Sequence, residues 1–243
     1  MKRLSLLLAF LLALSPLAAR AQDPSPAEVD QIERIVRDYL KQHPEVVVEA
    51  LKAYQAEEDA KKAEALKGTI ASLKSELLAD PDSPVGGNPE GDVAIVEFFD
   101  YRCPYCKAMA PDLAKVLAAD GKVRLVYKEY PILSPTSVIA AKAALAARYQ
   151  NKYVAFHDRL MSLKGSLDES QIYSIAADAG LNVARLKADM ERPEIADAIN
   201  RNYSLADKLN IEGTPAFVIG DQLLDGVATA DELAAAIKQA RGG

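Results

Sequence analysis

Apolar residues in the second half of the chain follow the pattern of alternating strands and helices. Residues 93–99 are almost continuously apolar, as in a strand that is buried on both faces of a sheet. Leu113, Val116 and Leu117 then recur at helical spacing, and residues 123–127 form a second apolar run. The pattern therefore predicts a strand, a helix and a second strand in succession.

The rest of this region is predicted to be mainly helical until two further strands. Residues 136–210 show helical spacing throughout and form the body of an insert expected at about 134–210. Short strands are expected at 216–219 and 223–224, and Thr229 is expected to cap a last helix. A β-α-β unit, a helical insert and a closing β-β-α unit together predict an α/β protein, a thioredoxin fold with an inserted helical domain.

Residues 22–80, which precede this region, are predicted to form an N-terminal α-helical segment. His43-Pro44 divides the segment, because a proline interrupts helical hydrogen bonding. Apolar residues recur at helical spacing on both sides of the break. They are Val29, Ile32, Val36 and Tyr39 before it, and Val47, Leu51 and Tyr54 in a second, short helix after it.

A further apolar pattern in this segment steps by three and four residues, like a short heptad seam. Its members are Ala63, Leu66, Ile70, Leu73 and Leu77. Either the helix packs on its own domain, or it pairs with other copies of the chain, and both interpretations stay open. Because so polar a helix needs a partner, we expect an oligomerisation segment at 22–80. Turn-forming residues then predict a linker at 81–91 and a catalytic domain at 92–243.

The first residues of the chain have the pattern of a secretory signal peptide. Lys2 and Arg3 precede the apolar run Leu4–Leu14, and Ala19-Arg20-Ala21 is a small-residue cleavage site. The alternative is a membrane anchor, but a span requires about 20 apolar residues, and this run has 11. We therefore expect a signal peptide at 1–21 and export of the mature chain, and the family resemblance described below implies the periplasm as its destination.

Charge and residue counts exclude several classes of partner. The formal net charge of −6 becomes −9 when the three basic residues of the signal peptide are removed. An acidic chain without a basic cluster argues against nucleic acid as a partner. A structural zinc site needs four ligands, whereas His43 and His157 lie in different regions from the two cysteines. We expect no metal site and no cofactor, with His43 at a helix junction and His157 hydrogen-bonded within the insert.

Both cysteines of the chain lie in Cys103-Pro104-Tyr105-Cys106, between the first strand and the helix after it. A disulfide that closes so short a loop removes only about 2 kcal/mol of chain entropy, so it would stabilise the fold little. The pair is therefore interpreted as a redox-active dithiol. A helix that begins here offers unpaired N–H groups and a positive dipole, which favour a thiolate. Cys103 is therefore predicted to be the nucleophile and the more exposed of the two cysteines. Cys106 is predicted to be the shielded resolving thiol, with Pro104 at the first helical position.

Gly213-Thr214-Pro215 is predicted to be the second half of the site. In a thioredoxin fold, the strand after the insert begins with a cis-proline beside the cysteine pair. Thr214 could then offer its backbone to an extended substrate, as an added strand does. The alternative is an ordinary trans turn proline, since cis forms are only about 5–6% of X–Pro bonds.

Glu97 is the third candidate, because it interrupts the apolar run of residues 93–99. An ionised carboxylate is costly in a buried strand. We expect Glu97 to have a raised pKa and to relay the proton of Cys106 during exchange. The alternative is a carboxylate paired with a lysine at the sheet edge.

Several motifs resemble those of the DsbA-like family of disulfide oxidoreductases. The stretch from Glu97 to Cys106 carries the resemblance, which extends through the insert to Thr214-Pro215 and the last helix. Within that family, the chain is most similar to the suppressor-of-copper-sensitivity protein C (ScsC) group. The matching motifs are Tyr39-Leu40, His43-Pro44-Glu45, Gly87-Asn88-Pro89, Pro131-Ile132-Leu133 and Ala140-Ala141.

This resemblance implies a function beyond what the spacing of residues shows. It implies disulfide reduction and isomerisation on exported proteins, a homo-oligomer with a trimer favoured, a membrane redox partner and a link to copper tolerance. Thr214, the residue before the proline, resembles the residue at that position in isomerase and reductase members. The dipeptide Pro104-Tyr105 between the cysteines departs from the Pro-His of strongly oxidising members. A net dithiol oxidase and a copper(I) carrier that uses the same thiolates remain as alternatives.

Overall fold

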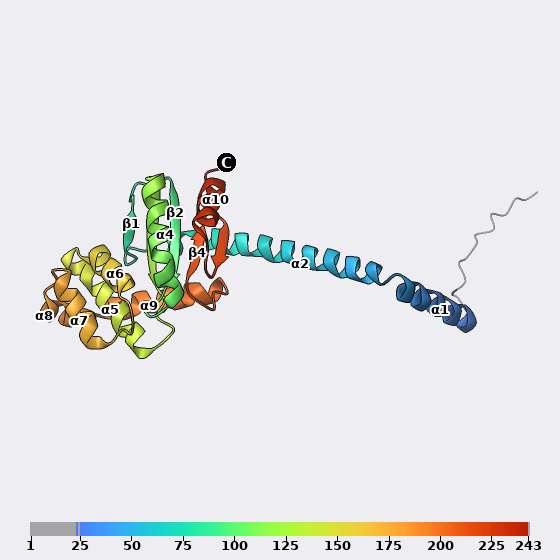
Figure 1. Ribbon diagram of the computed structural model, residues 1–243, viewed down its shortest axis with the longest axis horizontal. Helices are drawn as coiled ribbons and strands as arrows, with labels where there is room; N and C mark the ends of the chain where they lie inside the picture. The colour runs from blue at the N-terminus through green and yellow to red at the C-terminus, as the bar shows by residue number, and fades with distance from the viewer. Residues whose placement is uncertain (1–22, 24, 243) are drawn as a thin grey trace, which may run out of the picture. The chain divides into compact units, whose positions relative to one another are not determined.

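The computed structural model describes residue 23 and residues 25–242, and the chain divides into two compact units, residues 1–58 and 59–243 (Figure 1). The signal peptide predicted at 1–21 lies outside the described residues. None of the helices in the described part of the chain has the length and apolar character needed to cross a bilayer.

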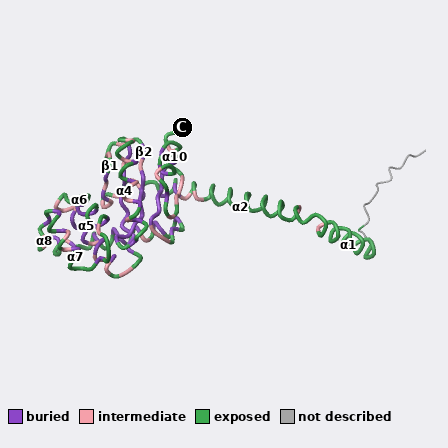
Figure 2. Tube along the Cα trace, viewed as in Figure 1, coloured by how far each residue is buried: buried purple, intermediate pink, exposed green. Residues whose placement is uncertain are grey.

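Helix α1 (Pro26–Gln42) has well-formed ends. Ser25 and Glu28 form a capping box, and the backbone N–H of Ser25 donates to the Glu28 carboxylate at 2.8 Å. His43 ends the helix, and its ring Nδ1 lies 3.1 Å from Oε1 of Glu45. This confirms His43 as a helix-junction residue. No residue of α1 is buried within the chain, as Figure 2 shows.

Helix α2 (Pro44–Ser72) is a single helix of 29 residues. The expectation of a short second helix is therefore wrong. The alanine, glutamate and lysine residues after Tyr54 are strong helix formers, and nothing in them ends the helix. The helix spans the boundary between the two units, so its residues from Asp59 onward belong to the second unit.

A five-stranded sheet forms the centre of the second unit, in the order β1-β3-β2-β4-β5. Strands β2 and β3 are parallel, and every other neighbouring pair is antiparallel. The strands are β1 (Val85–Gly87), β2 (Val93–Phe99), β3 (Val123–Glu129), β4 (Ala216–Ile219) and β5 (Gln222–Asp225). The strands predicted at 93–99 and 216–219 are confirmed at those bounds.

Helices cover the sheet and form the predicted insert (Figure 1). On one face, α4 (Pro104–Asp120) packs beside α10 (Ala230–Ala240), which Thr229 caps as predicted. The insert consists of α5 (Pro135–Ala147), η1 (Arg148–Gln150), α6 (Tyr153–Ser162), α7 (Glu169–Asp178), α8 (Val183–Met190) and α9 (Pro193–Lys208). The α/β class, the helical insert and the N-terminal helical segment are confirmed.

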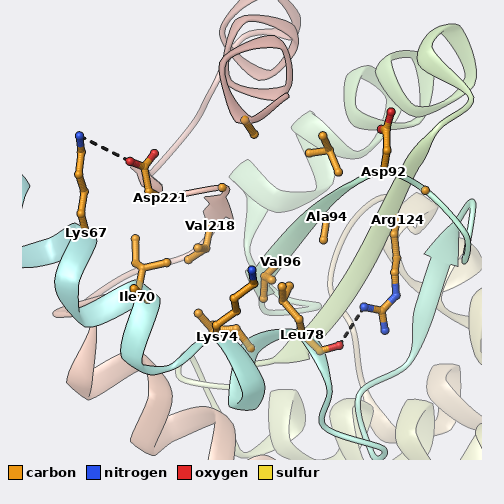
Figure 3. A pocket seen from close by; sticks show the side chains of 16 residues that line it. Lys67, Ile70, Lys74, Leu78, Asp92, Ala94, Val96, Arg124, Val218 and Asp221 are labelled. Atoms are coloured by element: carbon orange, nitrogen blue, oxygen red, sulfur yellow. Dashed lines mark hydrogen bonds and ion pairs between the residues drawn. The ribbon is translucent and has the colours of Figure 1, made fainter. Parts of the chain in front are cut away.

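The opposite face of the sheet is covered by the end of α2, by α3 (Lys74–Leu78) and by the end of α9. Ile70, Leu73 and Leu77 are buried there against a core that includes Val96 and Val218 (Figure 3). Burying one such side chain stabilises the fold by about 1.5–3 kcal/mol. The apolar seam therefore packs on its own domain at these three positions, where the sequence left both interpretations open.

The stretch predicted as a linker, residues 81–91, differs from that expectation because it contains β1. Val85 to Gly87 pair with β3, and the backbone N–H of Tyr127 donates to the Pro84 carbonyl at 3.0 Å. Gly86 has a packing reason: a Cβ there would lie 2.5 Å from the hydroxyl of Tyr127.

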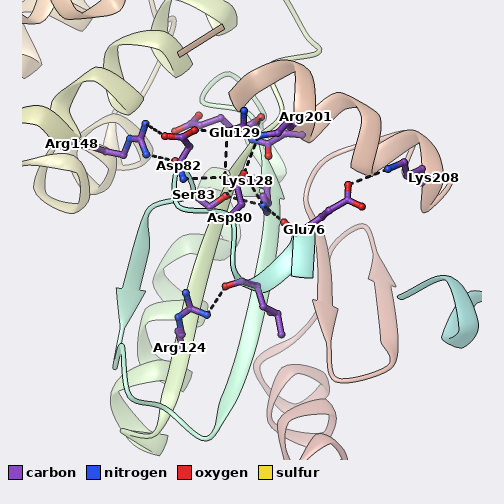
Figure 4. Close-up of polar contacts among 12 residues, drawn as sticks. Glu76, Asp80, Asp82, Ser83, Arg124, Lys128, Glu129, Arg148, Arg201 and Lys208 are labelled. Carbon is purple, nitrogen blue, oxygen red and sulfur yellow. Dashed lines mark hydrogen bonds and ion pairs between the residues drawn. The ribbon is translucent and has the colours of Figure 1, made fainter. Parts of the chain in front are cut away.

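A buried lysine joins this stretch to the sheet (Figure 4). Lys128 is fully buried, and its ammonium donates to the Glu76 carbonyl and to the Ser83 hydroxyl, both at 2.8 Å. Asp80 lies 3.7 Å from the same ammonium and also pairs with Arg201 of α9. Removing one partner from such a network commonly costs about 3–5 kcal/mol of stability. Residues 76–83 are therefore firmly attached to the sheet of the second unit.

Candidate active site

Cys103 occupies the N-cap position of α4, directly after the loop that follows β2. Its backbone is extended, Pro104 takes the first helical position, and the Cys106 N–H donates to the Cys103 sulfur at 3.3 Å. Proline suits that position because its missing N–H has no helical partner there. The sequence thus places a sulfur atom where the helix presents unpaired N–H groups.

Thr214 and Pro215 lie directly beside this sulfur. The Thr214–Pro215 peptide bond is cis, as predicted. The Cys103 thiol donates to the Thr214 carbonyl at 3.2 Å. The structure therefore brings together two motifs that are 111 residues apart in the chain.

The two thiols have opposite acidities. The hydrogen bond from the Cys106 thiol is the largest cause that lowers the pKa of Cys103, to about 6, and burial opposes it. The Thr214 hydroxyl and the backbone N–H groups of Cys106 and Tyr105 lower that pKa further. Burial, followed by the hydrogen bond to Cys103, raises the pKa of Cys106. At neutral pH the first sulfur is ionised and the second is protonated.

The exposure of the sulfurs is small at both positions. Cys103 is 2% exposed and Cys106 is 0% exposed, so the first cysteine is the more accessible of the two only by a narrow margin. Tyr105, between them, is 61% exposed. Both cysteines are free thiols.

Glu97 lies in the middle of the sheet, not at its edge. Its neighbours in register are Tyr127 on β3 and Phe217 on β4. Burial raises the pKa of Glu97 to about 8, and the nearby charge of Cys103 adds to the effect. No ion pair within the described residues involves Glu97, so the lysine-paired alternative is not what the structure shows. The predicted rise in pKa is present.

Glu97 also lines a hollow of about 770 Å³ between α4 and α6. Tyr127, His157 and Asp158 line the same hollow. Burial raises the pKa of Asp158. A carboxyl group that is buried in the sheet therefore faces a largely apolar space whose walls include a few polar residues.

Asp100, a functional residue beside the cysteine loop, was not identified from the sequence. Asp100 is buried, and its carboxylate accepts from the N–H of Arg102 at 2.7 Å and from the N–H of Leu133 at 3.0 Å. Its position at the end of a buried strand, three residues before Cys103, is the signal that could have identified it. Asp100 holds the loop that presents the nucleophile.

A second buried polar cluster lies behind the same loop. The Tyr101 hydroxyl donates to the Glu129 carboxylate at 3.0 Å, and Tyr153 donates to the same oxygen at 2.8 Å. The Nδ1 atom of His157 lies 3.0 Å from the Tyr101 hydroxyl, which confirms His157 as a hydrogen-bonded residue of the insert. Burial lowers the pKa of His157 to about 3. These residues come from three segments, the loop after β2, β3 and α6, so no local pattern could predict the cluster.

No group of three or more histidine, cysteine, aspartate or glutamate residues with metal-binding geometry occurs among the residues that the structure describes. The chemistry that the site offers is that of the two thiols, the carboxyl group of Glu97 and the backbone of Thr214.

Fold and site together define a thioredoxin-fold protein with a reduced dithiol at a helix N-terminus. A family profile described as Thioredoxin matches residues 79–239, and a second profile, described as Copper resistance protein ScsC N-terminal domain, matches residues 28–61. The chain belongs to the thioredoxin family and is related to the ScsC and DsbA-like thiol–disulfide oxidoreductases. The resemblance that its motifs indicated is confirmed.

Three solved structures illustrate this relationship. A thioredoxin-like oxidoreductase from Silicibacter pomeroyi DSS-3 is 47% identical and has a TM-score of 0.68, with 70% of this chain and 98% of that chain covered. BcfH from Salmonella enterica Typhimurium is 30% identical, with 89% and 97% covered and a TM-score of 0.74. The catalytic domain of Proteus mirabilis ScsC is 31% identical, with 73% and 99% covered and a TM-score of 0.67.

Curated relatives include much longer proteins. The chain is 29% identical to the Na(+)/H(+) antiporter NhaA 1 of Salinispora arenicola over 76% of its own length, but it spans only 29% of the length of that relative. The likeness is therefore to one part of the antiporter chain.

Proposed function

We propose that the chain is a periplasmic thiol–disulfide oxidoreductase that reduces and isomerises disulfides of exported proteins. The single observation that carries this proposal is the asymmetric pair of thiols: the pKa of Cys103 is lowered to about 6, and the pKa of Cys106 is raised. A thiolate is the species that attacks a disulfide. The protonated thiol of Cys106 stays unreactive until Cys103 has formed a mixed disulfide with the client.

The reaction begins when the Cys103 thiolate attacks one sulfur of a client disulfide. A mixed disulfide forms at Cys103, and the other client sulfur leaves as a thiolate. If a second client thiol attacks the mixed disulfide, the client disulfide is rearranged and Cys103 is regenerated. If Cys106 attacks instead, the client is reduced and a Cys103–Cys106 disulfide forms.

Glu97 is proposed to take the proton of Cys106 during the second route. Its pKa, raised to about 8 by burial, is much closer to that of a thiol than the pKa of an ordinary carboxylate is, and such a match favours proton transfer. The hollow beside α4 then provides a route for exchange of this proton with solvent.

Thr214 and Pro215 are proposed to bind the client backbone. The Thr214 carbonyl lies 3.2 Å from the nucleophilic sulfur, so an extended client segment that pairs with this backbone would bring its cysteine to Cys103. Pro104 and Tyr105 complete the proposed site. The exposed ring of Tyr105 is available to contact the client.

The first unit is proposed to associate with copies of itself, with a trimer favoured. Its apolar residues are exposed within the chain, unlike those at the end of α2. They are Val29, Ile32, Ile35, Val36, Tyr39, Val47, Val48, Leu51 and Tyr54. Burying such a stripe in a bundle would remove it from water, and several active sites on one assembly could hold a client during repeated exchange. A membrane protein is proposed to return the active site to its reduced state.

Refolding of a protein with scrambled disulfides tests the proposed activity. The mature chain should restore activity to the scrambled client, and a variant with Ile32→Glu and Val36→Glu should lose assembly and most isomerisation while keeping reductase activity. A Cys103→Ala variant should be inactive in both assays. Absence of refolding activity in the full assembly would contradict the proposed isomerase function.

A measured reduction potential separates the proposal from a net oxidase. A value near −200 mV is that of isomerases, whereas about −120 mV is that of a strong oxidant. A chain that bound copper(I) tightly but restored no scrambled client would instead support a carrier role in copper tolerance.

A further inference from the structure

The charged residues that line a groove beside Cys103 are all positively charged. The groove has a volume of about 670 Å³ and lies along the start of α4, opposite the loop that joins α6 to α7. Its charged residues are Arg102, Lys107 and Lys164, and no described aspartate or glutamate lines it. Pro104, the residue after the nucleophile, is part of its wall. Positive charge is concentrated here in a chain whose net charge is −6.

The three cations form no ion pair with a carboxylate. The Lys107 ammonium donates to the Leu163 carbonyl at 2.9 Å, and no ion pair in the described part of the chain involves Arg102, Lys107 or Lys164. Burial is the largest cause that lowers the pKa of Lys107, repulsion by Arg102 lowers it further, and the charge of Asp100 opposes both. Lys107 and Arg102 are thus close enough to repel each other, and Asp100 offsets part of that repulsion.

Nearby carboxylates are occupied or face another space. Asp100 is buried, and both of its oxygens accept backbone N–H groups. Glu97 and Asp158 line the adjacent hollow between α4 and α6, not this groove, whereas Lys107 lines both spaces. Arg102 and Lys164 line the groove and not the hollow, so their charge acts on whatever occupies the groove.

Most of the other residues that line the groove are apolar, which suits a polypeptide more than a small ion. Met161, Leu163 and Leu167 lie on the side of the insert, and Pro104 and Pro111 lie on the side of α4. An extended chain could place its own apolar atoms on this surface and its carboxylates near the cations. Elsewhere the acidic protein repels acidic clients.

We propose that this groove binds a carboxylate-bearing segment of the client, next to the disulfide that Cys103 attacks. The inference rests on the proposed function and adds a substrate class to it: clients with acidic residues beside the reacting cysteine. The groove would raise the rate of encounter and stabilise the bound client. The exchange itself is unchanged: one S–S bond forms at Cys103, one breaks, and the departing sulfur keeps the electron pair.

Three synthetic peptides test the proposal on the full reduced chain. Each has one cysteine activated as a 2-pyridyl disulfide, with glutamates, glutamines or lysines on both sides. Attack by Cys103 forms the mixed disulfide and releases pyridine-2-thione, whose absorbance gives the second-order rate constant. At low salt we expect the glutamate peptide to react about fivefold faster than the glutamine peptide, and the lysine peptide about fivefold slower. These differences should shrink below about twofold near 1 M salt, where the Debye length is about 3 Å.

Two charge reversals of equal size locate the effect. Lys164→Glu changes the groove, whereas Lys152→Glu makes the same change in net charge before the other end of α6, a helix of 10 residues or about 15 Å. Lys164→Glu should cut the preference for glutamate over glutamine by about threefold. Lys152→Glu should keep most of the preference.

The outcomes separate this inference from the proposed function. Equal rates for the three peptides at low salt would overturn the groove as a binding site, while the proposed function would stand. Equal losses in the two lysine variants would also overturn it, because net charge and not the groove would then set the rate. If the glutamine peptide itself failed to react, the nucleophilic role of Cys103 would be at fault.

Discussion

The acidity of Cys103 should depend on the thiol of Cys106. The hydrogen bond donated by that thiol is the largest cause of the low pKa, about 6, of the first cysteine. Cys106→Ala removes this donor without adding charge. We therefore expect the substitution to raise the pKa of Cys103 and to slow its reaction with disulfides at pH 6 to 7.

The size of the shift follows from the energy of the lost hydrogen bond. A hydrogen bond to a charged group contributes about 1.5–3 kcal/mol, and one pKa unit corresponds to about 1.36 kcal/mol. Losing it should raise the pKa by about one to two units, to about 7–8. The pKa should stay below that of a free thiol, about 8.5, because the Thr214 hydroxyl and the N–H of Tyr105 still stabilise the thiolate.

A pH titration of the thiolate ultraviolet absorbance measures this pKa. Cys106→Ser is the matched control, because its hydroxyl can still donate at the same position. The serine variant should titrate close to the unchanged protein, and the alanine variant clearly above it. If the alanine variant titrated at about pH 6 as well, the Cys106 thiol would not be the main cause of the acidity.

Three further predictions follow from buried groups elsewhere in the second unit or from its boundary. Leu77→Ala should lower the free energy of unfolding by about 2–5 kcal/mol, because Leu77 is 1% exposed. Leu51→Ala should change the free energy of unfolding of the monomer by less than about 0.5 kcal/mol. Equal effects of the two substitutions in denaturant titrations would contradict this prediction. Glu97→Gln should remove a step near pH 8 from the rate of client reduction, since the pKa of Glu97 is about 8; an unchanged pH profile would exclude the relay. Burial lowers the pKa of Lys128 to about 8, whereas a lysine in the unfolded chain has a pKa of about 10.4. Between pH 8 and 10 the unfolded state therefore binds more protons than the folded state, and the stability of the fold should rise with pH. Lys128→Met should flatten that rise in thermal unfolding.

Much of the catalytic unit could be predicted because its signals are local. The apolar run of residues 93–99 gives a central strand, and a charged residue within it marks Glu97 as unusual. The cysteine motif directly follows this strand, and Gly213-Thr214-Pro215 directly precedes the next central one. The pairing of the two motifs needed knowledge of the fold, since 111 residues separate them.

The features that were missed depend on tertiary contacts. Strand β1 has three residues, too few to show a period of two. The hydrogen bonds among Tyr101, Glu129 and Tyr153 join three separate segments. The cationic groove likewise combines the start of α4 with the loop after α6. No single stretch of sequence contains enough of these sites to reveal them.

The sequence left two interpretations of the apolar seam open for a related reason, and the observed packing changes how oligomerisation should be tested. Its spacing fits an intermolecular seam and a helix on a sheet equally well, but Leu73 and Leu77 are buried against the sheet. A chain that began near Gly91 would lose these residues together with β1 and the partners of Lys128. Lost isomerase activity in that chain would reflect a damaged core as much as a missing first unit. Substitutions confined to the exposed apolar residues before Asp59 remove this ambiguity, because those side chains are exposed within the chain.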